Sequence, residues 1–249
     1  MTVMPVDWVL LDIEGTTSSL SFVHEVMFPY ARERMEAFLQ ERGSEHGVCA
    51  ALEGLAREDA GAVAAGVVPG SWRTPEDLRG WVAHLHALMD RDAKVGGLKA
   101  LQGMIWEGGF RDGTLRAHVF ADVPVALDGW SRQGVGLGVY SSGSVAAQKL
   151  FFAHTIEGDL AHHFSRHFDT EIGGKREATS YRRIAQTLGQ APDRVLFVSD
   201  VAEELDAAAA VGLRTALAER PGNRPVPQCL HPRIGTLTGL RLERTPLGA

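Results

Sequence analysis

The sequence predicts an α/β fold in which a doubly wound, mostly parallel sheet carries a helical cap domain inserted after its first strand. A short apolar run near the N-terminus ends abruptly in acidic residues, as a buried parallel strand does when it reaches a sheet edge. Helical patterns with few β-branched runs then fill residues 45 to 118. Beyond them, apolar strands alternate with helices, which is the pattern of βαβ units.

The first strand is the apolar segment WVLL, residues 8–11, which Asp12, Glu14 and Gly15 follow. The next segment runs to Gly43, a residue that commonly stops a helix. Apolar side chains recur in it at roughly helical spacing, at Phe28, Met35, Phe38 and Leu39. We therefore expect a strand, a turn and then a helix.

The insertion is expected to be helical throughout. The segment TPEDLRGWVAHLHALMDRD opens with Thr74 as N-cap, Pro75 at the first helical position and Asp77 close behind. The segment LKALQGMIWEGGF follows and closes with two glycines. We expect residues 1–20 and 121–249 to form the core domain and residues 21–120 to form the cap.

The second part of the core alternates regularly between strand and helix patterns. Strands are expected in VGLGVYSS, RVLFVSD and LRTALA, and helices in VPVALDGWSRQG, SVAAQKLFFAHT, ATSYRRIAQTLGQ and EELDAAAAVG. The tail from Pro221 is rich in Pro and Gly, and we expect it to wrap the surface.

Composition narrows the class of protein. The formal net charge is -6 and no Lys/Arg cluster forms a stripe, which argues against a nucleic-acid binder. No apolar stretch approaches a membrane span, and the N-terminus lacks the pattern of a signal peptide. Cys49 and Cys229 lie far apart and form no CxxC. We expect a monomeric cytoplasmic protein that acts on a small molecule, without nucleic-acid or membrane partners.

Polar side chains gather at the predicted carboxyl ends of the strands, where open α/β sheets bind ligands. One further residue, Lys175, follows two glycines in the loop between the last two of these strands. The set comprises Asp12 and Glu14, Ser141 and Ser142, Lys175, and Ser199 and Asp200, with Glu204 just beyond.

This set suits phosphoryl transfer. Acids that share a site repel one another, so a divalent cation is expected, and oxygen ligands favour Mg²⁺. One carboxylate can attack phosphorus, while a lysine and hydroxyls hold the phosphate oxygens. The helix after Ser141–Ser144 adds backbone N–H groups for the phosphate.

Each residue also has a plainer interpretation. Asp12 can cap a turn, Ser141 and Ser142 can cap a helix, Lys175 can be a solvated loop residue, and Asp200 can be the N-cap of the next helix. The functional interpretation fails only if all of these plainer interpretations are true together. That coincidence is improbable, because the residues follow one order along the chain and are all expected at one sheet edge.

The motifs DIEGT (12–16), SSG (141–143), Lys175 and SD (199–200) resemble the four motifs of the haloacid dehalogenase superfamily. The sequence around these motifs is still more similar to one family of the superfamily, the enolase-phosphatases of methionine salvage (acireductone synthases). DIEGTTSSLSFVHEVMFPYA, LQGMIWEGGF, VYSSGSVAAQKLFF, GGKREATSYRRIA and FVSDVAEELDAA carry this resemblance, which spans nearly the whole chain. The superfamily usually has DxD at its first motif, whereas DIEGT is typical of this family.

The resemblance implies a role for each residue. Asp12 would be the nucleophile, and Asp12, Asp200 and the backbone carbonyl of Glu14 would ligate one Mg²⁺. The Glu14 side chain would be a general acid/base. The substrate phosphate would be bound by Ser141, Ser142 and Lys175, and Lys175 would share in catalysis. Glu204 would support Lys175 or the metal waters.

The resemblance also implies the reaction. The substrate would be 2,3-diketo-5-methylthiopentyl-1-phosphate, which is enolised and then dephosphorylated to the acireductone. Glu14 is a candidate for the enolising base, but the sequence does not assign that proton transfer. Within the cap region, Phe22, Gln102, Met104 and Trp106 either contact the methylthio end or pack in the cap core.

Three other functions compete with this one. A capped phosphatase for another phosphomonoester, such as a sugar phosphate, fits the same residues. A metal-free dehalogenase does not need the extra acids. A signalling receiver uses similar residues but is about half as long and has no helical insertion. His162, His163 and His167 suggest either a zinc site or, more simply, surface or loop histidines.

Overall fold

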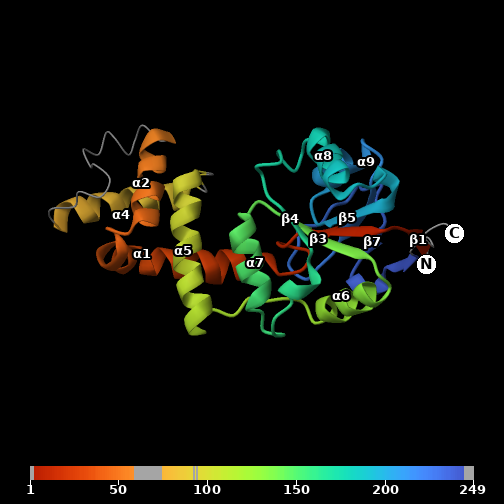
Figure 1. Cartoon of the computed structure of the whole chain (residues 1–249), viewed down its shortest axis with the longest axis horizontal. Helices are drawn as coiled ribbons and strands as arrows, with labels where there is room; N and C mark the ends of the chain where they lie inside the picture. The colour runs from red at the N-terminus through yellow and green to blue at the C-terminus, as the bar shows by residue number, and fades with distance from the viewer. Residues whose placement is uncertain (1–2, 59–74, 92, 94, 244–249) are drawn as a thin grey trace. The chain divides into compact units, whose positions relative to one another are not determined.

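The computed structural model describes residues 3–58, 75–91, 93 and 95–243 (Figure 1). The chain divides into two compact units: Met1–Val23 with Arg116–Ala249, and His24–Leu115. The first is called the sheet unit here and the second the helical unit. The expected domain boundaries lie a few residues away, at 20/21 and 120/121. The assignment of a catalytic role and a cap role to these units stays a prediction.

The sheet unit holds the strands. They are β1 (Val3–Pro5), β2 (Trp8–Leu11), β3 (Gly136–Tyr140), β4 (Arg166–Phe168), β5 (Val195–Ser199), β6 (Arg214–Ala218), β7 (Arg233–Ile234) and β8 (Arg241–Glu243). Its helices are α6 (Asp122–Arg132), α7 (Val145–Ala153), α8 (Ala178–Leu188) and α9 (Ala202–Ala209), with the short 3₁₀ turns η2 (Ala161–His163), η3 (Pro192–Arg194) and η4 (Leu237–Gly239).

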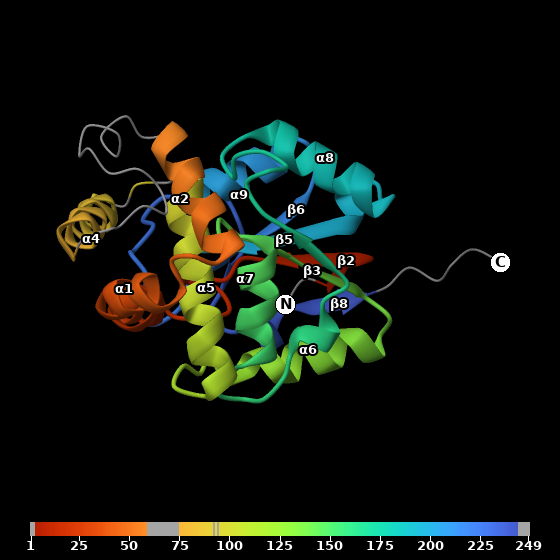
Figure 2. The ribbon, with the colours of Figure 1, turned by 60° about the vertical axis from the view of Figure 1, so that its left-hand side comes forward.

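Among the described residues, six strands form one parallel sheet in the order β4-β3-β2-β5-β6-β7. Strand β2 lies in its centre between β3 and β5, as Figure 2 shows. Val9, Leu10 and Leu11 of β2 are fully buried, because helices cover both faces of the sheet. This confirms the α/β class and the parallel sheet.

Helices α8 and α9 lie on one face of the sheet and α6 on the other (Figure 1). The core under α8 and α9 joins Leu10 and Phe197 of the strands to Tyr181, Ile184 and Leu205 of the helices. The alternation of side chains along a strand sends Leu10 to this face and its neighbours Val9 and Leu11 to the other.

Short strands that the sequence did not reveal extend the sheet at its edges. β4 and β7 are the two edge strands, and the latter lies in the tail that was expected only to wrap the surface. β1 and β8 form a separate parallel pair, in which Met4 lies opposite Leu242. These strands are two or three residues long, too short for a hydrophobic period to show.

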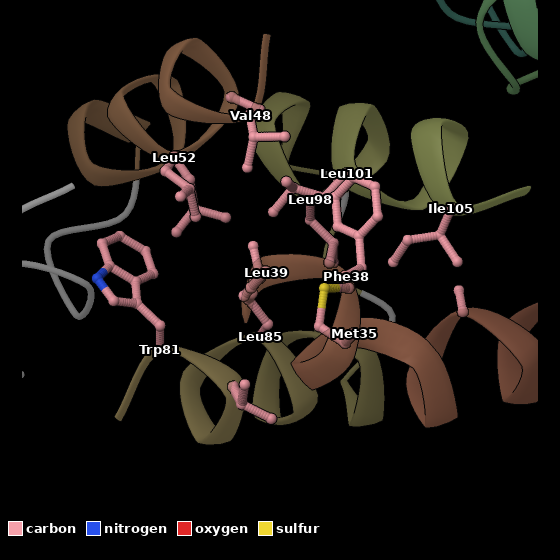
Figure 3. Close-up of a cluster of buried hydrophobic side chains, with 14 of the residues drawn as sticks. Met35, Phe38, Leu39, Val48, Leu52, Trp81, Leu85, Leu98, Leu101 and Ile105 are labelled. Atoms are coloured by element: carbon pink, nitrogen blue, oxygen red, sulfur yellow. The ribbon is translucent and has the colours of Figure 1, made fainter. Parts of the chain in front are cut away.

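The helical unit contains α1 (Phe28–Arg42), α2 (His46–Glu58), α4 (Pro75–Asp90) and α5 (Gly96–Asp112). A π-helical segment η1, Phe22–Met27, precedes α1. All four helices contribute to one buried core, drawn in Figure 3, which includes Met35, Leu52, Trp81, Leu85 and Leu101. The helix expected to stop at Gly43 ends at Arg42. The proposed N-cap, Thr74, lies outside the described residues.

No helix in the described part of the chain is long and apolar enough to cross a membrane.

The packing of α2 against α5 requires a glycine at position 97. A Cβ there would lie 2.3 Å from the Ala51 carbonyl oxygen and 2.6 Å from Leu55 Cβ. We predict that Gly97→Ala lowers the free energy of unfolding by about 1–3 kcal/mol through overpacking. Gly108→Ala on the same helix meets nothing within 4 Å and should raise it by ~0.5–1 kcal/mol. Urea unfolding measures both; equal effects would show that the close packing is absent.

Candidate active site

The carboxyl ends of three neighbouring strands bring the predicted site residues to one edge of the sheet. Leu11 pairs with Val139 of β3 and with Val198 of β5. The next residue, Asp12, continues the ladder, because its amide donates to the Val198 carbonyl at 3.0 Å. Ser141, which directly follows β3, and Ser199, the last residue of β5, therefore lie at the same sheet edge as Asp12.

Lys175 reaches this edge from the loop before α8. Its Nζ lies 2.6 Å from Asp12 Oδ2 and 2.7 Å from Glu204 Oε2. All three side chains are buried, with 10%, 6% and 11% of their surface exposed. Lys175 is thus a buried ion-pair partner, and the interpretation of it as a solvated loop residue is wrong.

Ser199 completes the contacts of the two acids. Its Oγ donates to Glu204 Oε2 at 2.9 Å and lies 3.4 Å from Asp12 Oδ2. Because a hydroxyl has only one proton to donate, Ser199 donates its hydrogen bond to the nearer acceptor, Glu204. Burial raises the pKa of Glu204, and the charge of Asp12 adds to this, while Lys175 and Ser199 oppose it.

Asp200 lies against the turn that follows Asp12. Gly15 has φ 65°, and a Cβ on it would lie 2.3 Å from Asp200 Oδ2, so only glycine fits here. Burial and the charge of Asp12 raise the pKa of Asp200 to about 7, although Lys175 acts in the opposite direction. A cation close to such a carboxyl group would stabilise its ionised form and lower its pKa.

The residues at this edge fit a hard divalent cation in their chemistry. The expected ligands are the carboxylates of Asp12 and Asp200 and the main-chain carbonyl of Glu14, all of them oxygen donors. Within the described residues no three His, Cys, Asp or Glu side chains are grouped to hold a metal. The expected set has only two such side chains, because its third donor is a backbone oxygen. Glu14 itself is half-buried and pairs with Ser18 through an isolated bridge.

The interpretations of these residues as helix caps do not hold. Ser144, not Ser141 or Ser142, is the N-cap of α7, and its Oγ accepts from the Ala147 amide at 3.2 Å. The N-cap position of α9 is Val201, so Asp200 is not a cap either. Asp12 does accept from the adjacent Ile13 amide at 2.8 Å through Oδ1, and its Oδ2 faces Lys175.

A buried arginine, which the sequence analysis missed, holds the turn after Asp12. Arg220 Nε donates to the Thr16 carbonyl at 2.8 Å, and its terminal nitrogens pair with both carboxylate oxygens of Asp122 at 2.8 and 3.0 Å. Asn223 Nδ2 donates to the Gly15 carbonyl at 2.8 Å. Arg220 follows β6 at the same sheet edge, so a systematic reading of every strand end would have found it.

A buried glutamine, also missed, holds the loop of Ser141. Gln148 Nε2 donates to the carbonyls of Gly143 and Phe168 at 2.9 and 2.7 Å. Its Oε1 faces His167 Nδ1 at 3.3 Å. Burial and the charge of Lys149 lower the pKa of His167 to about 4, so this histidine is neutral and can serve as a hydrogen-bond donor.

The other histidines and the cap-region candidates have packing contacts. His162 is exposed, and His163 Nε2 lies 3.4 Å from an Asp128 carboxylate oxygen. Phe22 belongs to the sheet unit and packs near Phe151, with ring centroids 6.1 Å apart. In the helical unit, Gln102 is buried, Trp106 Nε1 donates to the Met27 carbonyl at 2.8 Å, and both Met104 and Trp106 pack on the core. Their contact with a substrate stays a prediction.

Comparisons with known proteins show which proteins this chain resembles. The family model of haloacid dehalogenase-like hydrolases matches residues 6–212. Enolase-phosphatase E1 of Klebsiella pneumoniae is 46% identical over 238 residues, 96% of this chain and 98% of the relative. Enolase-phosphatase E1 of Stenotrophomonas maltophilia is 49% identical over 220 residues, 88% and 90% of the two chains. The crystal structure of the UTR4 protein of Saccharomyces cerevisiae matches with TM-score 0.75 and 35% identity, covering 93% of this chain and 98% of that one.

The raised pKa of Asp200 predicts how metal-free protein responds to pH. The folded state keeps the Asp200 proton up to about pH 7, whereas the unfolded chain loses it near the ordinary aspartate pKa of 3.8. The contribution of this group to stability is therefore full below the unfolded pKa and is lost as the pH rises to about 7. We expect a slope of up to about 1.4 kcal/mol per pH unit from this one proton.

Urea unfolding in EDTA at a series of pH values measures that slope. Asp200→Asn cannot take up the proton and should flatten the decline, whereas the exposed control Glu203→Gln should leave it in place. A decline that is the same in wild type and Asp200→Asn would show that Asp200 titrates normally.

Proposed function

Because this chain belongs to the enolase-phosphatase E1 family of the haloacid dehalogenase-like hydrolases, we propose that it is a bifunctional enolase-phosphatase of methionine salvage. It enolises 2,3-diketo-5-methylthiopentyl-1-phosphate and then hydrolyses the phosphate ester to give the acireductone. The observation that best supports this proposal is the cluster of Asp12, Lys175 and Glu204, with half-buried Asp200 beside them, at the end of the central strand.

In the phosphatase step, Asp12 is the nucleophile. A carboxylate oxygen of Asp12 attacks phosphorus, the bond from phosphorus to the substrate oxygen breaks, and an aspartyl-phosphate forms. The Glu14 side chain gives a proton to the leaving substrate oxygen. It then takes a proton from the water that attacks the aspartyl-phosphate, which releases inorganic phosphate and returns Asp12 to its carboxylate form. Lys175 Nζ, already 2.6 Å from Asp12 Oδ2, neutralises charge on the phosphate oxygens, and Ser141 and Ser142 hold the same group.

The cofactor of the proposal is one Mg²⁺ per chain, which Asp12, Asp200 and the main-chain carbonyl of Glu14 would hold. When bound, it supplies positive charge beside the phosphate and polarises the neighbouring carbonyl of the substrate. The Glu14 side chain would remove the proton from the carbon next to that carbonyl in the enolisation. Glu204 keeps Lys175 in place through its 2.7 Å contact with Nζ.

The protein is proposed to work in the cytoplasm as a monomer. Its proposed partner is the small phosphate ester alone, with neither nucleic acid nor a membrane.

Asp12→Asn tests the role of the nucleophile. We predict that phosphate release falls by on the order of 10⁴-fold or more, because a neutral amide cannot attack phosphorus. The fold should persist, since the new side chain has the same shape and reduces the repulsion among the buried acids. Circular dichroism and the melting temperature check that point. A robust phosphatase rate in the variant would refute the assignment.

Turnover of the synthetic diketone phosphate tests the function itself. Ultraviolet absorbance should show an enol before phosphate is released, and EDTA should stop both signals until Mg²⁺ is added. A panel of other phosphomonoesters is the control. A sugar phosphate that reacts far faster than the diketone, or activity indifferent to EDTA, would count against the proposal.

A further inference from the structure

Three hydroxyl groups hold three consecutive main-chain carbonyls at the loop that carries Lys175. Tyr140 Oη donates to the carbonyl of residue 173 at 3.0 Å. Ser180 Oγ donates to that of residue 174 at 2.8 Å, and Tyr181 Oη to that of residue 175 at 2.6 Å. The last of these is the carbonyl of the lysine itself.

The donors sit on rigid parts of the sheet unit. Tyr140 is the last residue of β3, and Ser180 and Tyr181 lie in the first turn of α8. All three residues are 0% exposed, so water does not compete for these hydrogen bonds. The loop is therefore held on both sides by groups that cannot easily move.

The glycine two residues before the lysine permits this close approach. Gly173 has φ 137°, and a Cβ on it would lie 2.2 Å from Ser180 Oγ. Any side chain at position 173 would therefore push the helix and its hydroxyl away from the loop. The absence of a side chain at Gly173 thus allows the hydroxyl of Ser180 to reach the carbonyl of residue 174.

The same aromatic side chains surround the lysine ammonium. Lys175 Nζ lies 6.0 Å from the ring centroid of Tyr140 and 6.0 Å from that of Phe197. Tyr181 packs on both of these rings, with centroids 5.4 and 5.1 Å away. Tyr140 and Tyr181, which hold the loop, thus also belong to the aromatic cluster next to the lysine side chain.

We propose that Tyr140, Ser180 and Tyr181 are positioning residues that act through Lys175, by fixing its main chain so that its ammonium reaches the phosphate beside Asp12. The inference rests on the proposed function, in which Lys175 binds the substrate phosphate. Tyr181 has the largest effect, because its short hydrogen bond is to the carbonyl of Lys175.

The hydroxyl protons needed for these bonds remain in place at physiological pH. Burial raises the pKa of Tyr140 to about 12, despite the opposing effects of Ser180 and the Lys175 charge. Burial also raises the pKa of Tyr181 above its usual value, with added effect from the charge of Glu204. Both phenols therefore stay protonated and act as donors.

A double-mutant cycle on orthovanadate binding tests the proposal. The dissociation constant of vanadate in saturating Mg²⁺ is measured by calorimetry for wild type, Tyr181→Phe, Lys175→Met and the double variant. We expect Tyr181→Phe to weaken binding by about fivefold in the wild-type background, the effect of one lost hydrogen bond. In the Lys175→Met background the same change should weaken it by less than about twofold.

Two control variants separate positioning from general stability. Thr155→Val removes a buried hydroxyl that donates to the Gly158 carbonyl at 2.6 Å, in the same unit but on another loop. Tyr30→Phe changes the third of the three tyrosines, whose hydroxyl lies 2.9 Å from Thr114 Oγ1 in the helical unit. Thr155→Val should lower the melting temperature, and both should leave vanadate affinity unchanged.

The outcomes separate this inference from the proposed function. Equal weakening by Tyr181→Phe in both backgrounds, or no weakening, overturns the inference even when the wild type turns over the diketone. A wild type that binds vanadate, shows the coupling, but does not release phosphate from the diketone overturns only the proposed substrate. A wild type that binds no vanadate in Mg²⁺ overturns both.

Discussion

The ion pair of one buried lysine with two buried carboxylates is the interaction on which the rest of the sheet unit depends. Lys175 Nζ contacts Asp12 at 2.6 Å and Glu204 at 2.7 Å. Asp12 follows β2, Lys175 lies in the loop before α8, and Glu204 belongs to α9. A buried acid that lost this partner would be strongly destabilised, because its charge would have no compensation. The arrangement still holds more acid than base, since Asp200 adds a third carboxyl whose pKa burial raises to about 7. This excess of acid favours a divalent cation, whose positive charge would also offset the negative charge of a phosphate at the same edge.

Precise placement of these side chains comes from contacts to the main chain of the loops that carry them. Arg220 and Asn223 donate to successive carbonyls in the turn after Asp12, and Gln148 donates to carbonyls around the loop of Ser141. The lysine loop is held by buried hydroxyls in the same way. Side chains on loops are placed only as well as their backbone is, so each of these donors helps to fix the position of the site residues. Glycines 15 and 173 take part in the same scheme by letting Asp200 and Ser180 approach the backbone closely.

The sequence predicted the central sheet and the meeting of the site residues, and the physical reasons are specific. Strands β2, β3 and β5 are buried on both faces and therefore show as apolar runs in the sequence. Ser199 ends β5, and Asp12 and Ser141 directly follow β2 and β3 at the same sheet edge. Strands β4, β7 and the pair β1–β8 went unseen because they are two or three residues long and are set by pairing with distant segments. Asn223 and Gln148 went unseen because contacts to backbone carbonyls require no particular residue pattern nearby. Ser144 and Val201 occupy the N-cap positions of α7 and α9, which excludes the plainer interpretation of Ser141, Ser142 and Asp200 as helix caps.

The central claim is that Asp12 itself accepts the phosphoryl group at the sheet edge where Lys175 and Asp200 also lie. Acid quenching during steady-state turnover of the diketone phosphate, followed by peptide mapping with mass spectrometry, tests it most directly. The account predicts one phosphoryl group on the peptide containing Asp12, as an acyl phosphate that hydroxylamine cleaves. Continued turnover with no phosphorylated peptide, or with the group on any other residue, would contradict it.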